Sequence, residues 1–318
     1  MYNFCTYFDK YYLYKGLTMC RSLKKHLPES RLWILCFDDT AYDIMGKLDL
    51  PNIKLIHYTN FEDDDLLKAK SNRSLVEYYW TCTPALPLYL LEIFPEMQHI
   101  TYLDADLYFF HDPSSAYQEL GDGSIFLTEH RYSKNITRNI DRNGRYNVQF
   151  MIFRNNVTGK EALEWWKQRC IEWCYIRREE GKLGDQKYLD DWTERFPGVC
   201  VSINKGIGLA PWNIERYLIT IRNGKLYVDE DMLLFYHFQN FTILKPGHYR
   251  LTHEKLSDVA KRFIYSAYID EIEVSMNLVK YINTSFEYEF KNVKINRLRD
   301  FVLSIMIYLR NNNVLRIK

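Results

Sequence analysis

Two aspartates, Asp104 and Asp106, interrupt an apolar and aromatic stretch that runs from residue 100 to residue 110. A continuous apolar run is typical of a buried strand, so residues 100–103 are predicted to form one. Residues at i and i+2 of an extended chain point to the same side, which brings both carboxylates together at the end of that strand. Buried carboxylates this close repel each other unless a cation lies between them, and oxygen ligands suit Mg²⁺ or Mn²⁺. The pair is therefore a candidate metal site.

Three interpretations of this pair are open on these residues alone. A surface Asp-x-Asp turn is common, but the apolar flanks on both sides argue against it. A phosphohydrolase of the haloacid dehalogenase type also places Asp-x-Asp after an apolar strand, yet it carries a small hydroxyl or β-branched residue where this chain has Tyr108. The third is the metal–diphosphate motif of nucleotide-sugar glycosyltransferases. A calcium hand is excluded, because Phe109 occupies the loop position that needs glycine.

Composition narrows the class of protein. The chain has 318 residues, 47% of them hydrophobic, which is enough for one large domain with an appendage. A formal net charge of +1 argues against nucleic acid as the main partner. The seven cysteines show no C-x-x-C spacing and are predicted to be reduced thiols of the core. The N-terminus has neither a basic n-region nor a long apolar h-region, so a cytoplasmic location is expected.

Apolar runs alternate with helical patterns in the first part of the chain, which predicts a parallel sheet with helices on its faces. The predicted strands are 4–8, 31–37, 53–58, 100–103, 124–128 and 146–153. Helices are predicted over 13–27, 41–48 and 75–93, the last broken near Pro84 and Pro87. Thr158 and Glu161 match a capping box that would open a further helix.

The composition changes after about residue 250. Residues 251–280 are predicted to be helical, and residues 291–318 contain seven Lys or Arg and one Asp. Within this basic segment, residues 301–309 form an apolar run that is too short to span a bilayer but suits a helix lying on an anionic membrane surface. A C-terminal helix packed on the domain is the alternative.

Four segments follow the aspartate pair in a fixed order: 146–150, 184–190, 209–213 and 236–241, the last followed by Lys245-Pro246. With the opening segment 6–12, they resemble the GT-A glycosyltransferases, especially a bacterial family 8-like group, over roughly residues 2–250. The resemblance implies an α/β GT-A domain with a mixed central sheet over 1–250 and a helical C-terminal extension over 251–318. It also implies metal-dependent transfer of a sugar from a nucleotide donor, expected to be a UDP-sugar.

The implied acceptor is a hydroxyl of a glycan or lipid-linked glycan in surface polysaccharide synthesis, and retention is favoured over inversion. The resemblance makes His237 the third metal ligand, and neutral imidazole is a common metal donor. It makes Asp185 and Gln186 the catalytic pair, which would orient the donor sugar or deprotonate the acceptor. Asp185 at the start of a helix is also compatible with simple capping. Asn240 departs from the pattern, which usually has glycine three residues after the histidine.

The remaining implied roles concern donor and acceptor. Residues for the donor nucleotide and its phosphates are Thr6, Tyr7, Asp9, Tyr12, Lys70, Arg73, Asp104, Ala105, Asn147, Gln149 and Lys245. Residues for the acceptor or sugar are Glu129, His130, Arg131, Trp212 and Asn213. Cationic side chains bind phosphate, but a solvated charge run explains Lys70 and Arg73 equally well, and helix capping explains Asp9. A phosphohydrolase and a non-catalytic glycan-binding protein on a transferase scaffold are the alternatives.

Overall fold

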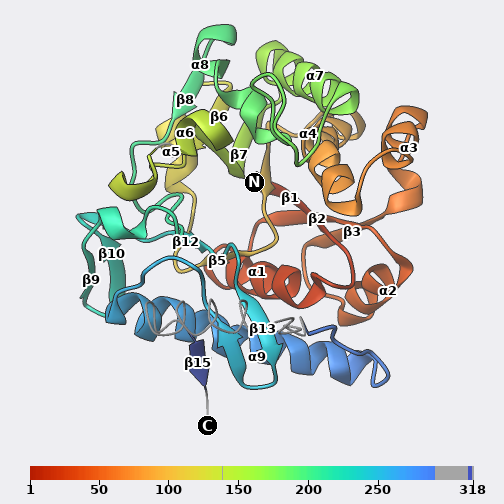
Figure 1. Cartoon of the computed structure of the whole chain (residues 1–318). Helices are drawn as coiled ribbons and strands as arrows, with labels where there is room; N and C mark the ends of the chain where they lie inside the picture. The colour runs from red at the N-terminus through yellow and green to blue at the C-terminus, as the bar shows by residue number, and fades with distance from the viewer. Residues whose placement is uncertain (138, 291–313, 317–318) are drawn as a thin grey trace.

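The computed structural model describes residues 1–137, 139–290 and 314–316. Its centre is a seven-stranded sheet with the order β3-β2-β1-β4-β7-β6-β8 (Figure 1). Its strands are β1 (Asn3–Phe8), β2 (Arg31–Cys36), β3 (Ile53–His57), β4 (His99–Leu103), β6 (Ile125–Glu129), β7 (Tyr146–Arg154) and β8 (Val199–Val201). Only β7 runs against its neighbours. The predicted mixed sheet is confirmed, and each predicted strand lies within a residue or two of an observed one.

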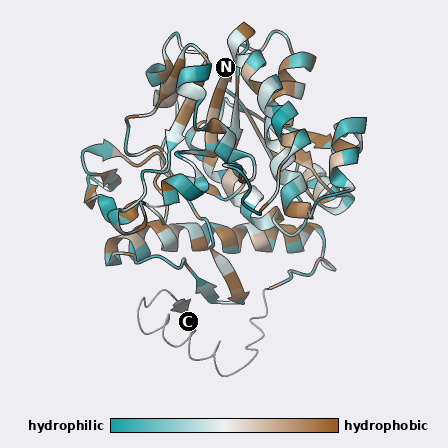
Figure 2. Ribbon diagram, turned by 45° about the horizontal axis from the view of Figure 1, so that its top comes forward, coloured by the Kyte–Doolittle hydropathy of each residue, from teal (hydrophilic) through white to brown (hydrophobic). Residues whose placement is uncertain are grey.

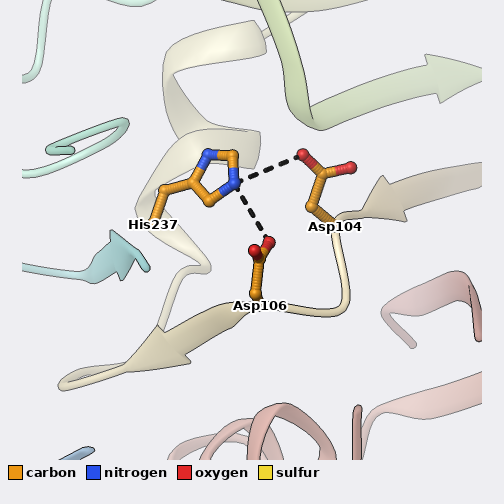
Figure 3. A group of neighbouring side chains, drawn as sticks. All are labelled: Asp104, Asp106 and His237. Carbon is orange, nitrogen blue, oxygen red and sulfur yellow. Dashed lines mark ion pairs between the residues drawn. The ribbon is translucent and has the colours of Figure 1, made fainter. Parts of the chain in front are cut away.

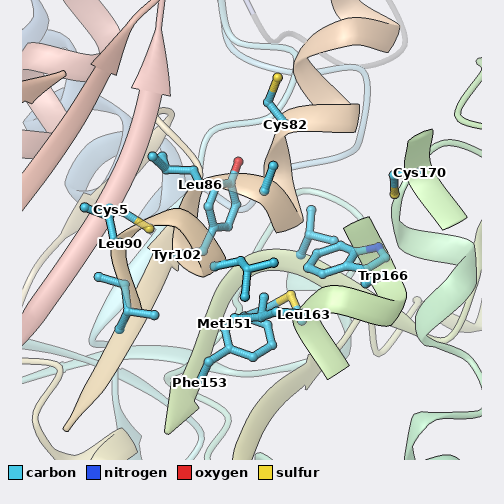
Figure 4. Packing of buried hydrophobic residues seen from close by; sticks show 14 of the residues in the cluster. Cys5, Cys82, Leu86, Leu90, Tyr102, Met151, Phe153, Leu163, Trp166 and Cys170 are labelled. Carbon is cyan, nitrogen blue, oxygen red and sulfur yellow. The ribbon is translucent and has the colours of Figure 1, made fainter. Parts of the chain in front are cut away.

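Helices cover both faces of this sheet, because successive residues of a strand point to opposite sides. On one face, Cys5 and Tyr102 pack against α4 (Leu75–Ile93) and α7 (Val157–Glu172), as Figure 4 shows. On the other face, Phe4 and Ile34 pack against α1 (Leu13–His26) and α2 (Asp39–Leu48). All seven cysteines are free of disulfides, and six of them are buried, as predicted for core thiols.

Two predictions about helix ends and breaks are wrong. Helix α4 runs through Pro84 and Pro87 without interruption, because burial of this apolar helix against the sheet outweighs the lost hydrogen bond and the steric cost that each proline imposes. A capping box of Ser74 and Glu77 fixes its start. Helix α7 begins after Asn156, whose side chain accepts from the amide of Gly159, so the Thr158–Glu161 match lies inside the helix.

Smaller elements extend the domain beyond the sheet. The shorter helices are α3 (Asp64–Lys70), α5 (Ser115–Leu120), α6 (Asn139–Asn143) and α8 (Trp192–Arg195), with 3₁₀ turns at Tyr58–Asn60, Lys134–Ile136, Gln186–Leu189 and Ile214–Arg216. The outer strands are β5 (Leu107–Phe109), β9 (Ile219–Arg222), β10 (Lys225–Val228), β11 (Asp231–Met232), β12 (Phe235–His237), β13 (Thr242–Lys245), β14 (His248–Arg250) and β15 (Val314–Arg316). Strand β5 pairs with β12, and β14 lies between β13 and β15.

The helix predicted over 251–280 begins later than expected. A π-helical turn over Ala260–Tyr265 continues into α9 (Ser266–Ile282). Helix α9 packs along α1, where the Thr18 hydroxyl donates to Ser275 Oγ at 2.8 Å, and its apolar and polar residues alternate along its length (Figure 2). The apolar run at 301–309 lies outside the described residues. Within the described ranges, no helix is long and apolar enough to cross a membrane.

Candidate active site

Asp104, Asp106 and His237 converge at the carboxyl end of β4 (Figure 3). Asp104 directly follows β4, Asp106 directly precedes β5, and His237 ends β12. Pairing of β5 with β12 sets Leu107 opposite His237, which brings the histidine beside both carboxylates. Its Nε2 lies 3.0 Å from Asp106 Oδ1 and 3.7 Å from Asp104 Oδ2. The strand pairing therefore assembles the three predicted ligands.

The charges of this cluster are strongly coupled. Burial raises the pKa of Asp104 to about 6, although His237 opposes the shift. Burial would also raise the pKa of Asp106, but His237, Lys15 and Tyr12 hold it well below its usual range. Burial lowers the pKa of His237, and the two carboxylates outweigh it and raise that pKa. A positive charge beside the two aspartates is therefore favoured. Either protonated His237 or a bound metal ion could carry it.

The cluster fits a divalent metal ion. Two carboxylate oxygens and one imidazole nitrogen lie within 4.8 Å of one another, and all three side chains are largely buried. Oxygen-rich sites with one nitrogen suit Mg²⁺ or Mn²⁺. Asp104, Asp106 and His237 are thus the residues that would hold such an ion.

A cleft of about 950 Å³ opens beside this cluster. It lies between the carboxyl ends of β1 and β4, at the point where the strand order reverses. Such a topological switch point is the usual ligand position in open α/β sheets. The predicted site residues that line it are Tyr7, Asp9, Tyr12, Asp104, Ala105, Asp106, Asn147, Asp185, Gln186 and His237.

Asp9 joins two parts of the cleft wall at the end of β1. One carboxylate oxygen accepts from the backbone amides of Tyr11 and Tyr12, both at 3.0 Å, and the other accepts from the Tyr79 hydroxyl at 2.9 Å. Tyr79 in turn stacks on Phe37 with ring centroids 4.3 Å apart. Asp9 therefore shapes the turn before α1 and also faces the cleft, but it does not cap the helix, because Tyr12 is the N-cap residue and no side chain caps α1.

Asp185 is a second buried carboxylate in the cleft, and only 4% of its surface is exposed. Burial raises its pKa to about 7, although a hydrogen bond from Thr83 opposes the shift. Within the described chain, its Oδ2 has no hydrogen-bond partner and the side chain caps no helix, so the capping interpretation is not supported. Its neighbour Gln186 donates to the backbone carbonyl of Asn143 at 2.9 Å, which fixes its amide.

The cations predicted for the donor phosphates lie elsewhere. Lys70 forms an ion pair with Glu62 at 2.6 Å. Arg73 directs its guanidinium to the Thr81 hydroxyl and to the backbone carbonyls of Cys170 and Ile171. Lys245 is exposed on β13, outside the cleft lining. Thr6 and Gln149 are fully buried beneath the cleft lining.

The predicted acceptor residues form a layer outside the cleft lining. His130 lies in this layer; its Nδ1 is 3.3 Å from the Arg145 carbonyl, and its Nε2 is 3.0 Å from the amide nitrogen of Asn147. The backbone carbonyl of His130 accepts from Trp212 and Asn213. The other two acceptor candidates are Glu129, which pairs with Arg145 at 2.6 Å, and Arg131, which donates to the backbone carbonyls of Asn204 and Ile207.

Other cleft residues escaped the sequence analysis. Among the described residues, the cationic side chains that line the cleft are Lys15, Arg178 and Arg250, and α4 adds Tyr79, Trp80 and Thr83. Lys15 follows Tyr12, the N-cap residue of α1, by three residues, and its ammonium donates to the Tyr12 hydroxyl at 3.0 Å. No comparable local signal marks Arg250, because only the pairing of β13 with β14 brings it to the cleft.

No protein-family model matches the chain. It is 34% identical to the uncharacterized protein YfnD of Bacillus subtilis over 286 residues, which cover 89% of this chain and 90% of YfnD. It is 33% identical to the uncharacterized protein YfnF of the same bacterium over 258 residues, covering 79% of this chain and 85% of YfnF. The chain belongs to the YfnD family. Neither relative's name states an activity.

Solved structures resemble the fold of this YfnD-family protein. A galactosyltransferase, LgtC, in complex with donor and acceptor sugar analogues, matches with a TM-score of 0.53 at 13% identity, covering 86% of this chain and 95% of LgtC. The glycosyltransferase GlyE of Streptococcus pneumoniae TIGR4 matches with a TM-score of 0.52 at 15% identity, covering 91% of this chain and 65% of GlyE. The predicted GT-A fold is thereby confirmed.

Proposed function

We propose that this YfnD-family protein is a metal-dependent glycosyltransferase that moves a sugar from a nucleotide-diphosphate donor to a hydroxyl of a glycan or lipid-linked glycan. The observation that carries the proposal is the convergence of Asp104, Asp106 and His237 in a large cleft at the switch point of a GT-A sheet. The names of LgtC and GlyE, which share the fold, support glycosyl transfer as the reaction class.

The chemistry explains why such a cleft needs these side chains. Transfer breaks the bond between an anomeric carbon and a diphosphate, and the diphosphate leaves with a high negative charge. A bound Mn²⁺ or Mg²⁺ would supply Lewis acidity to that leaving group. Asp104, Asp106 and His237 hold the position where the ion would lie, and a UDP-sugar is the donor we favour.

Arg250 is the best candidate for a protein cation on the donor phosphates. It lies on β14 and lines the cleft beside Thr242, to which its Nη2 donates at 3.2 Å. Within the described chain, Thr242 is the hydrogen-bond acceptor of this guanidinium, so other N–H groups of its five remain for a ligand. Guanidinium groups bind phosphate through paired donors. The negative charge of Glu289, which lines the same cleft, would partly offset the positive electrostatic potential of Arg250.

Asp185 is the carboxylate we assign to the reacting sugar. It lies in the cleft with one oxygen that no described group satisfies, and Gln186 beside it is held in place by the Asn143 carbonyl. In a retaining reaction, which we favour, Asp185 would orient the donor sugar and stabilise positive charge at the anomeric carbon. In an inverting reaction it would accept the proton of the acceptor hydroxyl.

A thermal-shift screen of UDP, GDP, CDP and their sugars, with and without Mn²⁺, tests the proposal. Binding to the native state stabilises the protein by about 2.7 kcal/mol when the ligand is at about 100 times its Kd. We expect a stabilising nucleotide whose effect requires Mn²⁺ and disappears in Asp106→Asn. Asp43→Asn, an exposed carboxylate on α2, is the matched control. Equal stabilisation in the presence of a chelator, or none by any nucleotide, would contradict the proposal.

A further inference from the structure

Each aspartate of the cluster is held by a tyrosine hydroxyl. Tyr12 donates to Asp106 Oδ2 at 2.7 Å, and Tyr102 donates to Asp104 Oδ1 at 3.0 Å. The other oxygen of each carboxylate faces His237. The two oxygens of each carboxylate thus have different partners, one a hydroxyl and the other the common point where a metal ion would lie.

Lys15 fixes the direction of the bond at Asp106. Its ammonium donates to the Tyr12 hydroxyl at 3.0 Å and lies 4.3 Å from the centre of the same ring. An ammonium has only donors, so the Tyr12 oxygen accepts from Lys15 and sends its own hydrogen to Asp106. Tyr12 is the N-cap residue of α1 and Lys15 lies in its first turn, so the start of the helix positions both side chains beside Asp106.

The surroundings of the two tyrosine–aspartate hydrogen bonds favour strong bonds. One member of each pair is buried: Asp106 is 6% exposed beside Tyr12, which is 37% exposed, and Tyr102 is 2% exposed. A hydrogen bond to a charged group is stronger than one between neutral groups, and more of its strength survives away from water. An ion that recruited the second oxygen of either carboxylate would compete with the tyrosine hydroxyl that already donates to that oxygen.

We propose that Tyr12 and Tyr102 are positioning residues that restrict each carboxylate to one metal-binding oxygen. The inference rests on the proposed function, since it concerns the same metal site. Two one-oxygen carboxylates and the imidazole fill half of an octahedral shell, which leaves three positions for diphosphate oxygens and water. Two-oxygen binding by both carboxylates would leave a single position, too few for a chelating diphosphate.

The experiment measures Mn²⁺ binding by electron paramagnetic resonance in wild type, Tyr12→Phe and Tyr102→Phe, without nucleotide. Removing an outer-shell partner typically weakens metal binding about 10- to 100-fold, and we expect at least a tenfold rise in Kd for each variant. In ¹⁷O-labelled water, wild type should show three bound waters, and each variant should show fewer, because the freed oxygen joins the ion.

Tyr79→Phe is the matched control, because it removes a tyrosine-to-aspartate hydrogen bond in the same cleft, at Asp9. Its Mn²⁺ affinity and water count should equal those of wild type. Circular dichroism shows whether each variant is folded, and Tyr12→Phe keeps the inference testable if Tyr102→Phe, at a buried position, does not fold. Unchanged affinity and water count in the tyrosine variants would overturn this inference alone. Failure of wild type to bind Mn²⁺ would overturn the proposed function as well.

Discussion

Asp185→Asn should stabilise the metal-free protein, by an amount that grows with pH. Burial raises the pKa of Asp185 to about 7, whereas an unfolded chain leaves it near its ordinary value of 3.8. The folded state therefore holds this proton more tightly than the unfolded state does. Between those two values, rising pH removes stability from wild type, and asparagine carries no such charge.

The magnitude follows from the two pKa values. Linkage gives a cost for the buried carboxylate of about 1.7 kcal/mol at pH 5 and about 4 kcal/mol at pH 8. The stability difference between Asp185→Asn and wild type should thus increase by about 2–3 kcal/mol over that range. Any pH-independent effect of the new amide cancels in this comparison.

Urea unfolding followed by circular dichroism at pH 5, 6, 7 and 8, with a chelator present, measures this difference. Asp43→Asn, at an exposed carboxylate on α2, is the matched control for the loss of one negative charge. Asp185→Asn should also abolish sugar transfer once a donor is known, which separates a functional carboxylate from a merely structural one. A difference that stays constant from pH 5 to pH 8 would refute the electrostatic reasoning.

Three further outcomes are expected. Burial lowers the pKa of His130 to about 3, so between pH 7.5 and pH 5 its imidazole gains a proton only in the unfolded state. By urea unfolding, the stability of His130→Gln relative to wild type should therefore rise by about 2 kcal/mol over that range, and the contribution of Asp185 cancels because both proteins carry it. Arg250→Gln should weaken nucleoside diphosphate binding about tenfold by calorimetry without changing nucleoside binding, and Lys245→Gln should change neither. Asp104→Asn should remove the Mn²⁺ dependence of nucleotide binding in a thermal-shift assay.

The sheet and the aspartate pair were accessible from sequence because both depend on local patterns. Apolar runs mark strands that helices cover on both faces, and the run before Asp104 is one of them. The two-residue spacing to Asp106 needs no information from the rest of the chain. His237 was found only through resemblance, since its place beside the aspartates depends on the pairing of β5 with β12.

The cations of the cleft were predicted less well, for a physical reason. A charged side chain near a site in sequence can turn to the nearest carboxylate or carbonyl, as Lys70 does with Glu62 and Arg73 with the end of α7. The pairing of β13 with β14 brings Arg250 to the cleft, and no local sequence pattern predicts that pairing. The long-range pairing of short strands is what the sequence leaves undetermined.

Asn240 shows how a departure from the family pattern is reconciled with the fold. It lies three residues after His237, where the family 8-like glycosyltransferases that the sequence resembles usually have glycine, and its φ is +64°. Glycine adopts this left-handed conformation most readily, and asparagine tolerates it better than most other residues. The turn that follows His237, the proposed metal ligand, is therefore kept, and it carries Thr242 and then Arg250 along the cleft wall. Replacing Asn240 by a β-branched residue would strain this turn and move Arg250 relative to His237, whereas glycine should be accepted.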